Sequence, residues 1–239
     1  MKNQKNLFKM LLLSMLVALG VVISPILRVE GMCPMAHFIN ITCSVFLGPW
    51  YSLLCATLIG IIRMAIMGIP PIALTGAIFG AFLSGVFYRM SKGKIVFAVI
   101  GEVVGTGIIG ALVSYPVMTF LWGKEGLSWI FYIPSFICGT LIGGSIAYVF
   151  LRKLADSGKL SQMQYMLTSR SYQDKSSLLS NTLVIAAFGA ILFVVIKIAS
   201  GIFNISPSIS DILSYISLVV CMLTSIIYYV FNKERKNDR

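Results

Sequence analysis

Long apolar stretches separated by short polar stretches dominate the chain. Runs of about 18 apolar residues or more are candidate membrane-spanning helices. The run over 36–67 is too long for one straight span, and Gly48-Pro49 interrupts it. Because proline lacks an N–H and disfavours helix in the preceding residue, we divide this run into a short helix, about 35–47, and a second helix, about 50–67. The pattern predicts eight spans, the other six lying over about 7–25, 72–89, 95–121, 128–151, 178–202 and 209–231.

The basic residues support this division. If the N-terminus is inside, the inside segments hold 15 of the 19 Lys and Arg residues, and the outside loops hold only Arg28 and Lys124. Basic residues accumulate on the cytoplasmic side of membrane proteins. If 35–67 were one span, every later loop would change side and the bias would disappear. We therefore expect a multi-pass protein of the cell membrane with both termini in the cytoplasm.

Glycine separates the spans into two groups. The spans over 72–151 contain three GxxxG pairs, which let helix backbones approach closely in lipid, namely Gly76/Gly80, Gly101/Gly105 and Gly139/Gly143. The last two apolar runs contain only Gly189 and Gly201. We therefore expect an all-α membrane protein with a six-helix domain over 1–155, a cytoplasmic polar linker over 156–177, and a two-helix membrane extension over 178–239.

Composition narrows the class of protein. Only 11% of residues are charged and the mean hydropathy is +0.92, whereas soluble domains carry about 25% charged residues. The net charge of +11 is spread along the flanks of the apolar runs, so nucleic acid is not an expected partner and the lipid bilayer is. The five cysteines form no CxxC pair, which argues against a disulfide framework or zinc site. The N-terminal run lacks an A-x-A-like cleavage site and is interpreted as a retained helix.

Glu102 lies within an apolar run, GEVVGTGIIGALVSYP. A charge at membrane depth costs several kcal/mol and commonly marks a function. At 100° per residue its face also carries Gly105, Thr106, Ile109, Val113 and Pro116. The topology places Glu102 in the cytoplasmic half of its helix. It is either a buried, hydrogen-bonded packing carboxyl or a group with a ligand, gating or coupling role. If it lies below the ligand, Glu102→Gln should keep most ligand binding.

Further candidates lie near the outer ends of the predicted helices. Arg63 either extends to the outer interface or lines an outer cavity, where Glu30 could pair with it. His37 and Asn40 share a helix face and are either interfacial hydrogen bonders or ligand contacts.

An aromatic group lies at the outer ends of the fifth and sixth predicted helices. Trp129, Tyr132 and Ser135 follow at three-residue steps and predict one stripe. The stripe is either part of an aromatic belt at the membrane interface or a surface that stacks on an aromatic ligand and hydrogen-bonds its edge.

No enzyme motif is present in the sequence. A P-loop, HExxH, GxSxG and a nucleotide-binding glycine fingerprint followed by an acidic residue are all missing. We expect a protein that is not an enzyme and binds no cofactor or metal. A transporter built from this chain would take energy from partners or from a gradient, so a proton-coupled carrier with Glu102 as relay stays an alternative. On the topology His37 and Glu102 lie near opposite membrane faces, which argues against a shared acid–base centre.

Several segments of the sequence together resemble one known family. The succession HFIN, LGPWYSLLCATLIGIIR, PPIALTGAIFGAFLSGVFYR, GEVVGTGIIGALVSYP and FYIPSF resembles the ThiW family over roughly residues 7–153. ThiW proteins are substrate-binding S components of energy-coupling factor (ECF) transporters, predicted to take up the thiazole precursor of thiamine. The resemblance implies a six-helix S-component fold with a short second helix. It also implies capture of a vitamin-like ligand near the outer face, and docking on a transmembrane coupling subunit that two ABC ATPases drive.

The resemblance also implies roles for individual residues. The substrate pocket would draw on His37, Asn40, Arg63, Thr75, Tyr115, Trp129, Tyr132 and Ser135. Docking would use Ser14-x-x-x-Ala18 in place of the usual alanine pair, and Glu102 and Thr106 would act in structure or coupling. A neutral hydroxyethylthiazole needs stacking and a few hydrogen bonds but no fixed counter-charge, which fits the Trp129 stripe better than Glu102. Thiamine and its pyrimidine precursor are alternative ligands. The two extra C-terminal spans depart from the family pattern.

Overall fold

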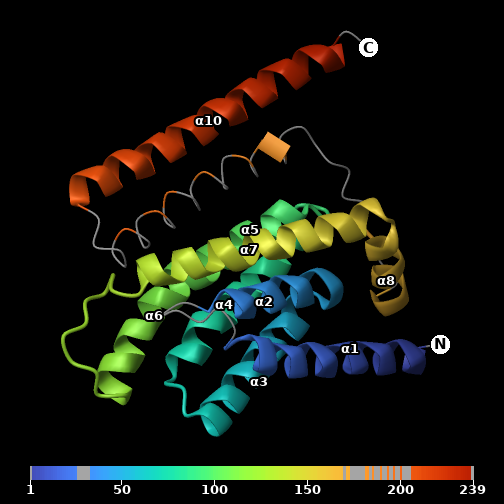
Figure 1. The fold of residues 1–239 in the computed structure, drawn as a ribbon. Coiled ribbons are helices and arrows are strands. Elements are labelled where there is room, and N and C mark those ends of the chain that lie inside the picture. Colours follow the sequence, from blue (N-terminus) through green and yellow to red (C-terminus); the bar gives the residue numbers. More distant parts are fainter. Residues whose placement is uncertain are drawn as a thin grey trace. The chain divides into compact units, whose positions relative to one another are not determined.

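The computed structural model is all-helical over the residues it describes (Figure 1). The described residues are 2–25, 33–168, 171–172 and 206–237, with the single positions 181, 182, 185, 189, 193, 196 and 200. The chain divides into two compact units, Met1–Asp174 and Lys175–Arg239. Six described helices are long and apolar enough to cross a membrane, and a shorter apolar helix accompanies them.

The first unit follows the predicted order of helices closely. The elements are α1 (Lys2–Ile23), α2 (Pro34–Leu47), α3 (Pro49–Met67), α4 (Ile72–Met90), α5 (Ile95–Glu102), η1 (Val103–Gly110), α6 (Ala111–Pro116), η2 (Val117–Leu121), α7 (Ile133–Asp156) and α8 (Lys159–Thr168). The four elements from α5 to η2 form one continuous rod over Ile95–Leu121. The last core helix was expected from about residue 128 and begins instead at Ile133.

The predicted break at Gly48-Pro49 is confirmed. Helix α2 ends at Leu47, α3 begins at Pro49, and Gly48 between them has a φ of 92°, a backbone conformation that glycine adopts without strain. The Gly48 N–H donates to the Ser44 carbonyl at 2.9 Å and closes the last turn of α2.

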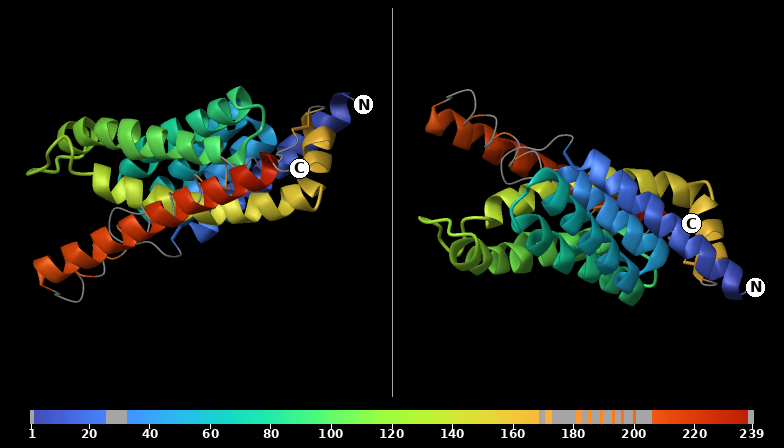
Figure 2. Two further views of the ribbon diagram at one scale, coloured as in Figure 1. Left: turned by 90° about the horizontal axis from the view of Figure 1, so that it is seen from above. Right: turned by 90° about the horizontal axis from the view of Figure 1, so that it is seen from below.

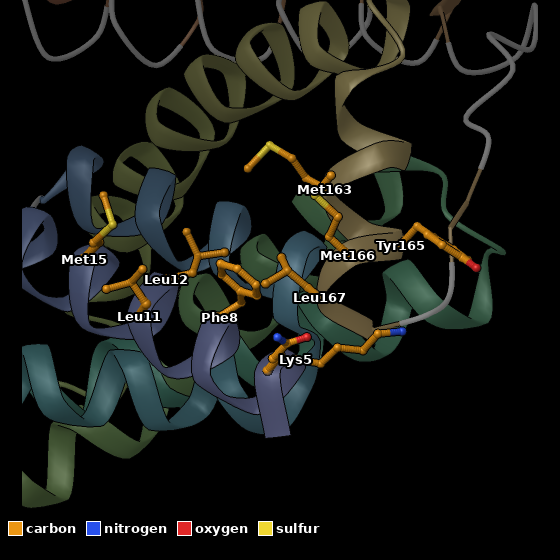
Figure 3. A pocket seen from close by; sticks show the side chains of 10 residues that line it. Lys5, Phe8, Leu11, Leu12, Met15, Met163, Tyr165, Met166 and Leu167 are labelled. Atoms are coloured by element: carbon orange, nitrogen blue, oxygen red, sulfur yellow. The ribbon is translucent and has the colours of Figure 1, made fainter. Parts of the chain in front are cut away.

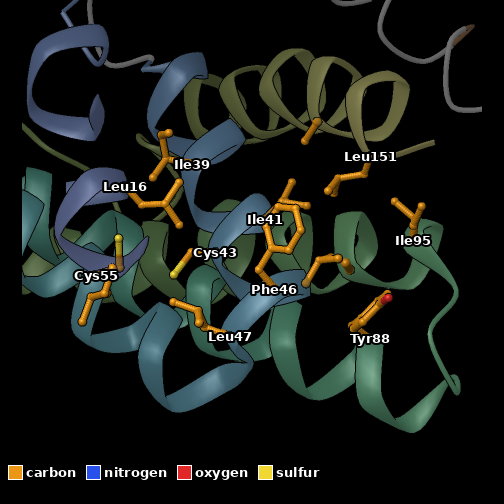
Figure 4. Packing of buried hydrophobic residues seen from close by; sticks show 14 of the residues in the cluster. Leu16, Ile39, Ile41, Cys43, Phe46, Leu47, Cys55, Tyr88, Ile95 and Leu151 are labelled. Carbon is orange, nitrogen blue, oxygen red and sulfur yellow. The ribbon is translucent and has the colours of Figure 1, made fainter. Parts of the chain in front are cut away.

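Helix α2 is the centre of the first unit. It has 14 residues, so it is about 21 Å long, too short to cross a hydrocarbon core of about 30 Å. Nearly all of its residues are buried, and it packs against α1, α3, α4, α5, α7 and α8. Figure 4 shows Ile39, Ile41 and Phe46 of α2 within the main apolar cluster. This short central helix is therefore surrounded by the other helices of the unit.

The first unit has two distinct ends (Figure 2). At one, which we call the N-terminal end, α1 begins, α2 and α4 finish and α5 begins. At the other, which we call the distal end, α3 and η2 finish and α4 and α7 begin. The 122–132 loop lies at the distal end.

Glycines bring the helices of this bundle into close contact. A Cβ atom at Gly80 of α4 would overlap the Thr106 hydroxyl of η1, and one at Gly143 of α7 would overlap the Pro34 carbonyl of α2. Any side chain at these two positions would push the helices apart. Gly80 and Gly143, each from one GxxxG pair, thus permit the close α4–η1 and α7–α2 contacts.

The α5–η2 rod departs from regular α-helix. Its η1 and η2 segments are π-helical, with wider turns than an α-helix. The buried positions on the rod consequently advance in steps of four, through Thr106, Gly110, Ser114 and Met118. The expected face was wrong beyond Thr106, because it assumed 100° per residue. Ile109 is 36% exposed, whereas Ser114 is fully buried.

The segment after α7 contains a helix that the sequence did not predict. Helix α8 packs against α1, α2 and α7 within the stretch that we expected to be a polar linker. Gln164 of α8 is buried, and its amide donates to the Val45 carbonyl at 2.9 Å and to the Tyr88 hydroxyl at 2.8 Å. The Gln164 side chain therefore satisfies a carbonyl in the last turn of α2.

The second unit contains α10 (Pro207–Asn237), which includes a candidate span over Ser208–Phe231. This agrees with the apolar run predicted over 209–231. The run predicted over 178–202 lies largely outside the described residues.

Candidate functional site

Glu102 is the acceptor at the centre of a buried polar cluster. Three donors point to one of its oxygens, Oε1: His37 Nδ1 at 2.8 Å, Asn40 Nδ2 at 3.0 Å and Thr106 Oγ1 at 3.2 Å. All four side chains are buried. The other oxygen, Oε2, is buried and has no hydrogen-bond partner among the described residues. The three contacts converge on one oxygen and hold the imidazole ring of His37 beside it.

The expected separation of His37 from Glu102 was wrong. Glu102 lies seven residues beyond the start of α5, and His37 lies ten residues before the end of α2. At 1.5 Å per residue both positions are about 10–15 Å from the N-terminal end. Because α2 is short, its first turn lies inside the bundle instead of at the distal surface. Distance therefore does not separate His37 from Glu102.

A cavity of about 480 Å³ opens beside this cluster toward the distal end. Its volume is in the range of small-molecule sites. His37 and Thr106 form part of its wall and connect it to Glu102. The described lining consists of Cys33, Ala36, His37, Arg63, Ile69, Pro70, Ile72, Ala73, Gly76, Ala77, Thr106, Met118, Lys124, Phe131, Tyr132, Ser135 and Phe136.

Two polar side chains that line the cavity have buried atoms without a hydrogen-bond partner among the described residues. Arg63 of α3 is 4% exposed, and its Nε has no hydrogen-bond partner among the described residues. Tyr132 is also 4% exposed, and its hydroxyl has no partner there either. Burial raises the pKa of the Tyr132 phenol, so this group remains a protonated donor at neutral pH. Since buried polar groups are normally satisfied, these two atoms indicate where a ligand would bind. Glu30, the suggested partner of Arg63, lies outside the described residues.

Four of the eight residues expected in the pocket line the cavity, namely His37, Arg63, Tyr132 and Ser135. Asn40 supports the pocket from behind through Glu102. The Thr75 hydroxyl instead hydrogen-bonds the Ser114 hydroxyl at 2.7 Å, outside the lining.

The expected aromatic stripe is divided in the structure. Because α7 begins only at Ile133, Trp129 does not share a helical face with Tyr132 and Ser135. Trp129 is 59% exposed and stacks on Tyr115, with ring centroids 4.4 Å apart. Neither of these two rings lines the cavity.

The cavity lining includes residues that were not expected from the sequence. Phe136 lies one helical turn from Tyr132, and their ring centroids are 5.8 Å apart. Phe131 packs edge-on against Tyr132 at 5.0 Å. The i, i+4 spacing of Tyr132 and Phe136 could have revealed the first. Lys124 could have been found because it is one of two basic residues that the topology placed in an outside loop.

Helix α1 presents an exposed apolar face. Ser14 and Ala18 are exposed and belong to a stripe that also contains Leu7, Leu11 and Val22. Beside it, α1 and α8 enclose a groove of about 450 Å³ near the N-terminal end (Figure 3). Phe8, Leu11 and Met15 of α1 and Met163 and Met166 of α8 are among its lining residues.

Comparison with known proteins identifies the family. Searches of curated proteins and of solved structures gave no match. The family model ThiW, described as thiamine-precursor transporter protein, matches residues 10–157, which is more than half of the chain. The match covers every helix that lines the cavity. The chain therefore belongs to the ThiW family of thiamine-precursor transporter proteins.

Proposed function

We propose that this chain is the substrate-binding S component of an ECF-type transporter, and that the distal cavity binds the thiazole precursor of thiamine, hydroxyethylthiazole. The observation that carries the proposal is the cavity itself. It has an aromatic wall of Phe131, Tyr132 and Phe136, and polar groups at His37, Thr106 and Ser135. Such a site can stack a small aromatic ring and hydrogen-bond its edge.

Glu102 acts in this site as a positioning residue. It is not part of the described lining, but its Oε1 holds His37 and Thr106, which are. A carboxylate that accepts from His37 Nδ1 fixes the orientation of the imidazole ring, and leaves Nε2 as its remaining polar atom. A ligand that changes how these helices pack around α2 would link ligand binding to docking on the other transporter subunits.

The orientation proposed here puts the distal end outside the cell and both termini in the cytoplasm. The cavity would then open to the side from which the precursor arrives. The basic residues in the sequence carry this part of the proposal.

The coupling subunit would dock on α1. The small residues Ser14 and Ala18 sit in the middle of an exposed apolar stripe, where another membrane helix can approach closely. Ser14→Trp and Ala18→Trp should abolish association with the coupling subunit and its two ATPases, while ligand binding by the isolated chain stays normal. Leu19→Trp, on a neighbouring exposed position, is the control. Association that survives both tryptophan variants would contradict this docking surface.

The ligand assignment is tested by thermal unfolding of the purified protein with hydroxyethylthiazole, thiamine or hydroxymethylpyrimidine. A ligand at 100 times its Kd stabilises the native state by about 2.7 kcal/mol. We expect the largest stabilisation with hydroxyethylthiazole. Stabilisation only by thiamine or by the pyrimidine would transfer the assignment to that compound, and stabilisation by none would contradict the proposal.

The His37–Glu102 contact also favours a second candidate, a proton-coupled carrier in which this pair takes up and releases a proton. Uptake in cells separates the two. An S component requires the ATPase subunits and resists an uncoupler in the short term, whereas a proton-coupled carrier works without the ATPases and stops when the uncoupler is added.

A further inference from the structure

Arg63 is a buried cation without a counter-charge in the described part of the protein. It is 4% exposed, lines the distal cavity, and forms no ion pair among the described residues. Its Nε has no hydrogen-bond acceptor there. A buried charge is costly unless it is paired and hydrogen-bonded. The side chain of Arg63 therefore indicates a missing acceptor inside the cavity.

The same cavity contains a second cation. Lys124, in the loop between η2 and α7, is exposed and lines the cavity, with its Nζ 5.8 Å from the centre of the Phe131 ring. No aspartate or glutamate occurs in the described lining. Glu102 is not part of the lining, and its Oε1 is occupied by contacts with His37, Asn40 and Thr106. The lining thus offers positive charge and hydroxyl donors, but no anion.

A neutral hydroxyethylthiazole would leave this charge uncompensated. Resting on the proposed function, we infer that the preferred ligand is an anionic form of the thiazole precursor, with an oxyanion group such as a phosphate monoester on its side chain. Arg63 presents a guanidinium fork that matches the geometry of phosphate or carboxylate oxygens. Lys124 adds a second positive charge, and the hydroxyl groups of Tyr132 and Ser135 are further donors. The aromatic ring would occupy the part of the cavity beside Phe136.

The inference is tested by equilibrium binding of two probes, hydroxyethylthiazole and hydroxyethylthiazole phosphate, to the full chain in detergent. Charge-assisted hydrogen bonds predict that the phosphate binds tighter by about 10- to 100-fold. Arg63→Gln should remove most of this preference, while binding of the alcohol changes little. Arg63→Lys should keep part of it, because the charge stays but the planar fork is lost. Lys124→Gln should reduce the preference by a smaller factor, and Lys153→Gln, an exposed lysine outside the lining, should not change it.

Three results decide the matter. A phosphate preference that disappears in Arg63→Gln and survives in Lys153→Gln supports the inference. Equal binding of the two probes, or tighter binding of the alcohol, would overturn it and leave the proposed thiazole transport intact. A permanent ion pair between Arg63 and Glu30 would give that second result. Binding of neither probe, with binding of thiamine or pyrimidine instead, would overturn both proposals. If Arg63→Gln does not fold, the Arg63→Lys and Lys124→Gln ratios decide between the first two results.

Discussion

Replacing Glu102 with leucine is expected to destabilise the protein strongly. Leucine has a similar size but removes the acceptor for His37, Asn40 and Thr106. Each buried donor left without a partner costs about 1–3 kcal/mol. Three of them predict a loss of at least about 3 kcal/mol. A change of this size lies at the upper end of the usual range for single substitutions, and loss of a buried hydrogen-bond network is one of its known causes.

Glutamine at the same position separates hydrogen bonding from charge. Glu102→Gln keeps an oxygen acceptor in the same place and removes the buried charge. The three bonds become weaker, but the loss of the charge offsets part of this because it needs less desolvation. The new amide nitrogen takes the place of Oε2, which has no described partner, so we expect a net loss of about 1 kcal/mol in stability. Because Glu102 orients His37, we now also expect a several-fold loss of ligand affinity, in contrast to the expectation from the topology alone.

The assay is thermal unfolding in detergent. For a chain of this size 1 kcal/mol corresponds to about 2–4 °C in Tm. Glu102→Leu should therefore lower the Tm by at least about 6 °C, a shift well beyond that of Glu102→Gln. Glu125→Leu and Glu125→Gln, at an exposed position of the 122–132 loop, are the matched controls. A Glu102→Leu protein as stable as the Glu125→Leu protein would refute the reasoning about the cluster.

Three further substitutions test other parts of the structure. Gly80→Ala should lower the Tm by an amount equivalent to about 1–3 kcal/mol, because its Cβ would overlap the Thr106 hydroxyl; an unchanged Tm would show that α4 and η1 are not in close contact. Gln164→Leu should release α8 and make it sensitive to limited proteolysis, since the Val45 carbonyl and the Tyr88 hydroxyl lose a donor; unchanged cleavage kinetics would contradict this. Tyr132→Phe should keep the Tm, because the hydroxyl has no described partner, but weaken ligand binding by about two- to ten-fold; equal affinity would remove the hydroxyl from the ligand site.

The parts of the fold that depend on local chemistry were predictable from the sequence. Gly48-Pro49 ends one helix and begins the next because of backbone restrictions that belong to those two residues. The GxxxG pairs likewise predicted close helix contacts, which Gly80 and Gly143 confirm. The apolar runs over 50–67, 72–89 and 95–121 matched helices to within one residue because the membrane sets their length, whereas the run over 128–151 corresponds to Ile133–Asp156.

The site was harder to predict because it depends on depth and register. If each helix started at a membrane surface, His37 and Glu102 would lie near opposite faces. The 14-residue α2 starts inside the bundle and brings them to 2.8 Å. The π-helical turns then shift the buried face of the rod from Ile109 to Ser114. Lastly, the late start of α7 separates Trp129 from the cavity. Each of these three features depends on how the helices pack against one another, which the order of apolar and polar residues along the chain does not reveal.

The central claim is that the distal cavity holds the thiamine precursor, and a tryptophan placed in its wall tests this most directly. Ala73 of α4 lines the cavity, whereas Ala65 of α3 is exposed and lies outside the described lining. The measurement is calorimetric titration of hydroxyethylthiazole and its phosphate ester into the wild-type protein, Ala73→Trp and Ala65→Trp. We predict binding by the wild-type protein and by Ala65→Trp, and none by a folded Ala73→Trp. Equal affinity in all three proteins would show that the ligand binds elsewhere.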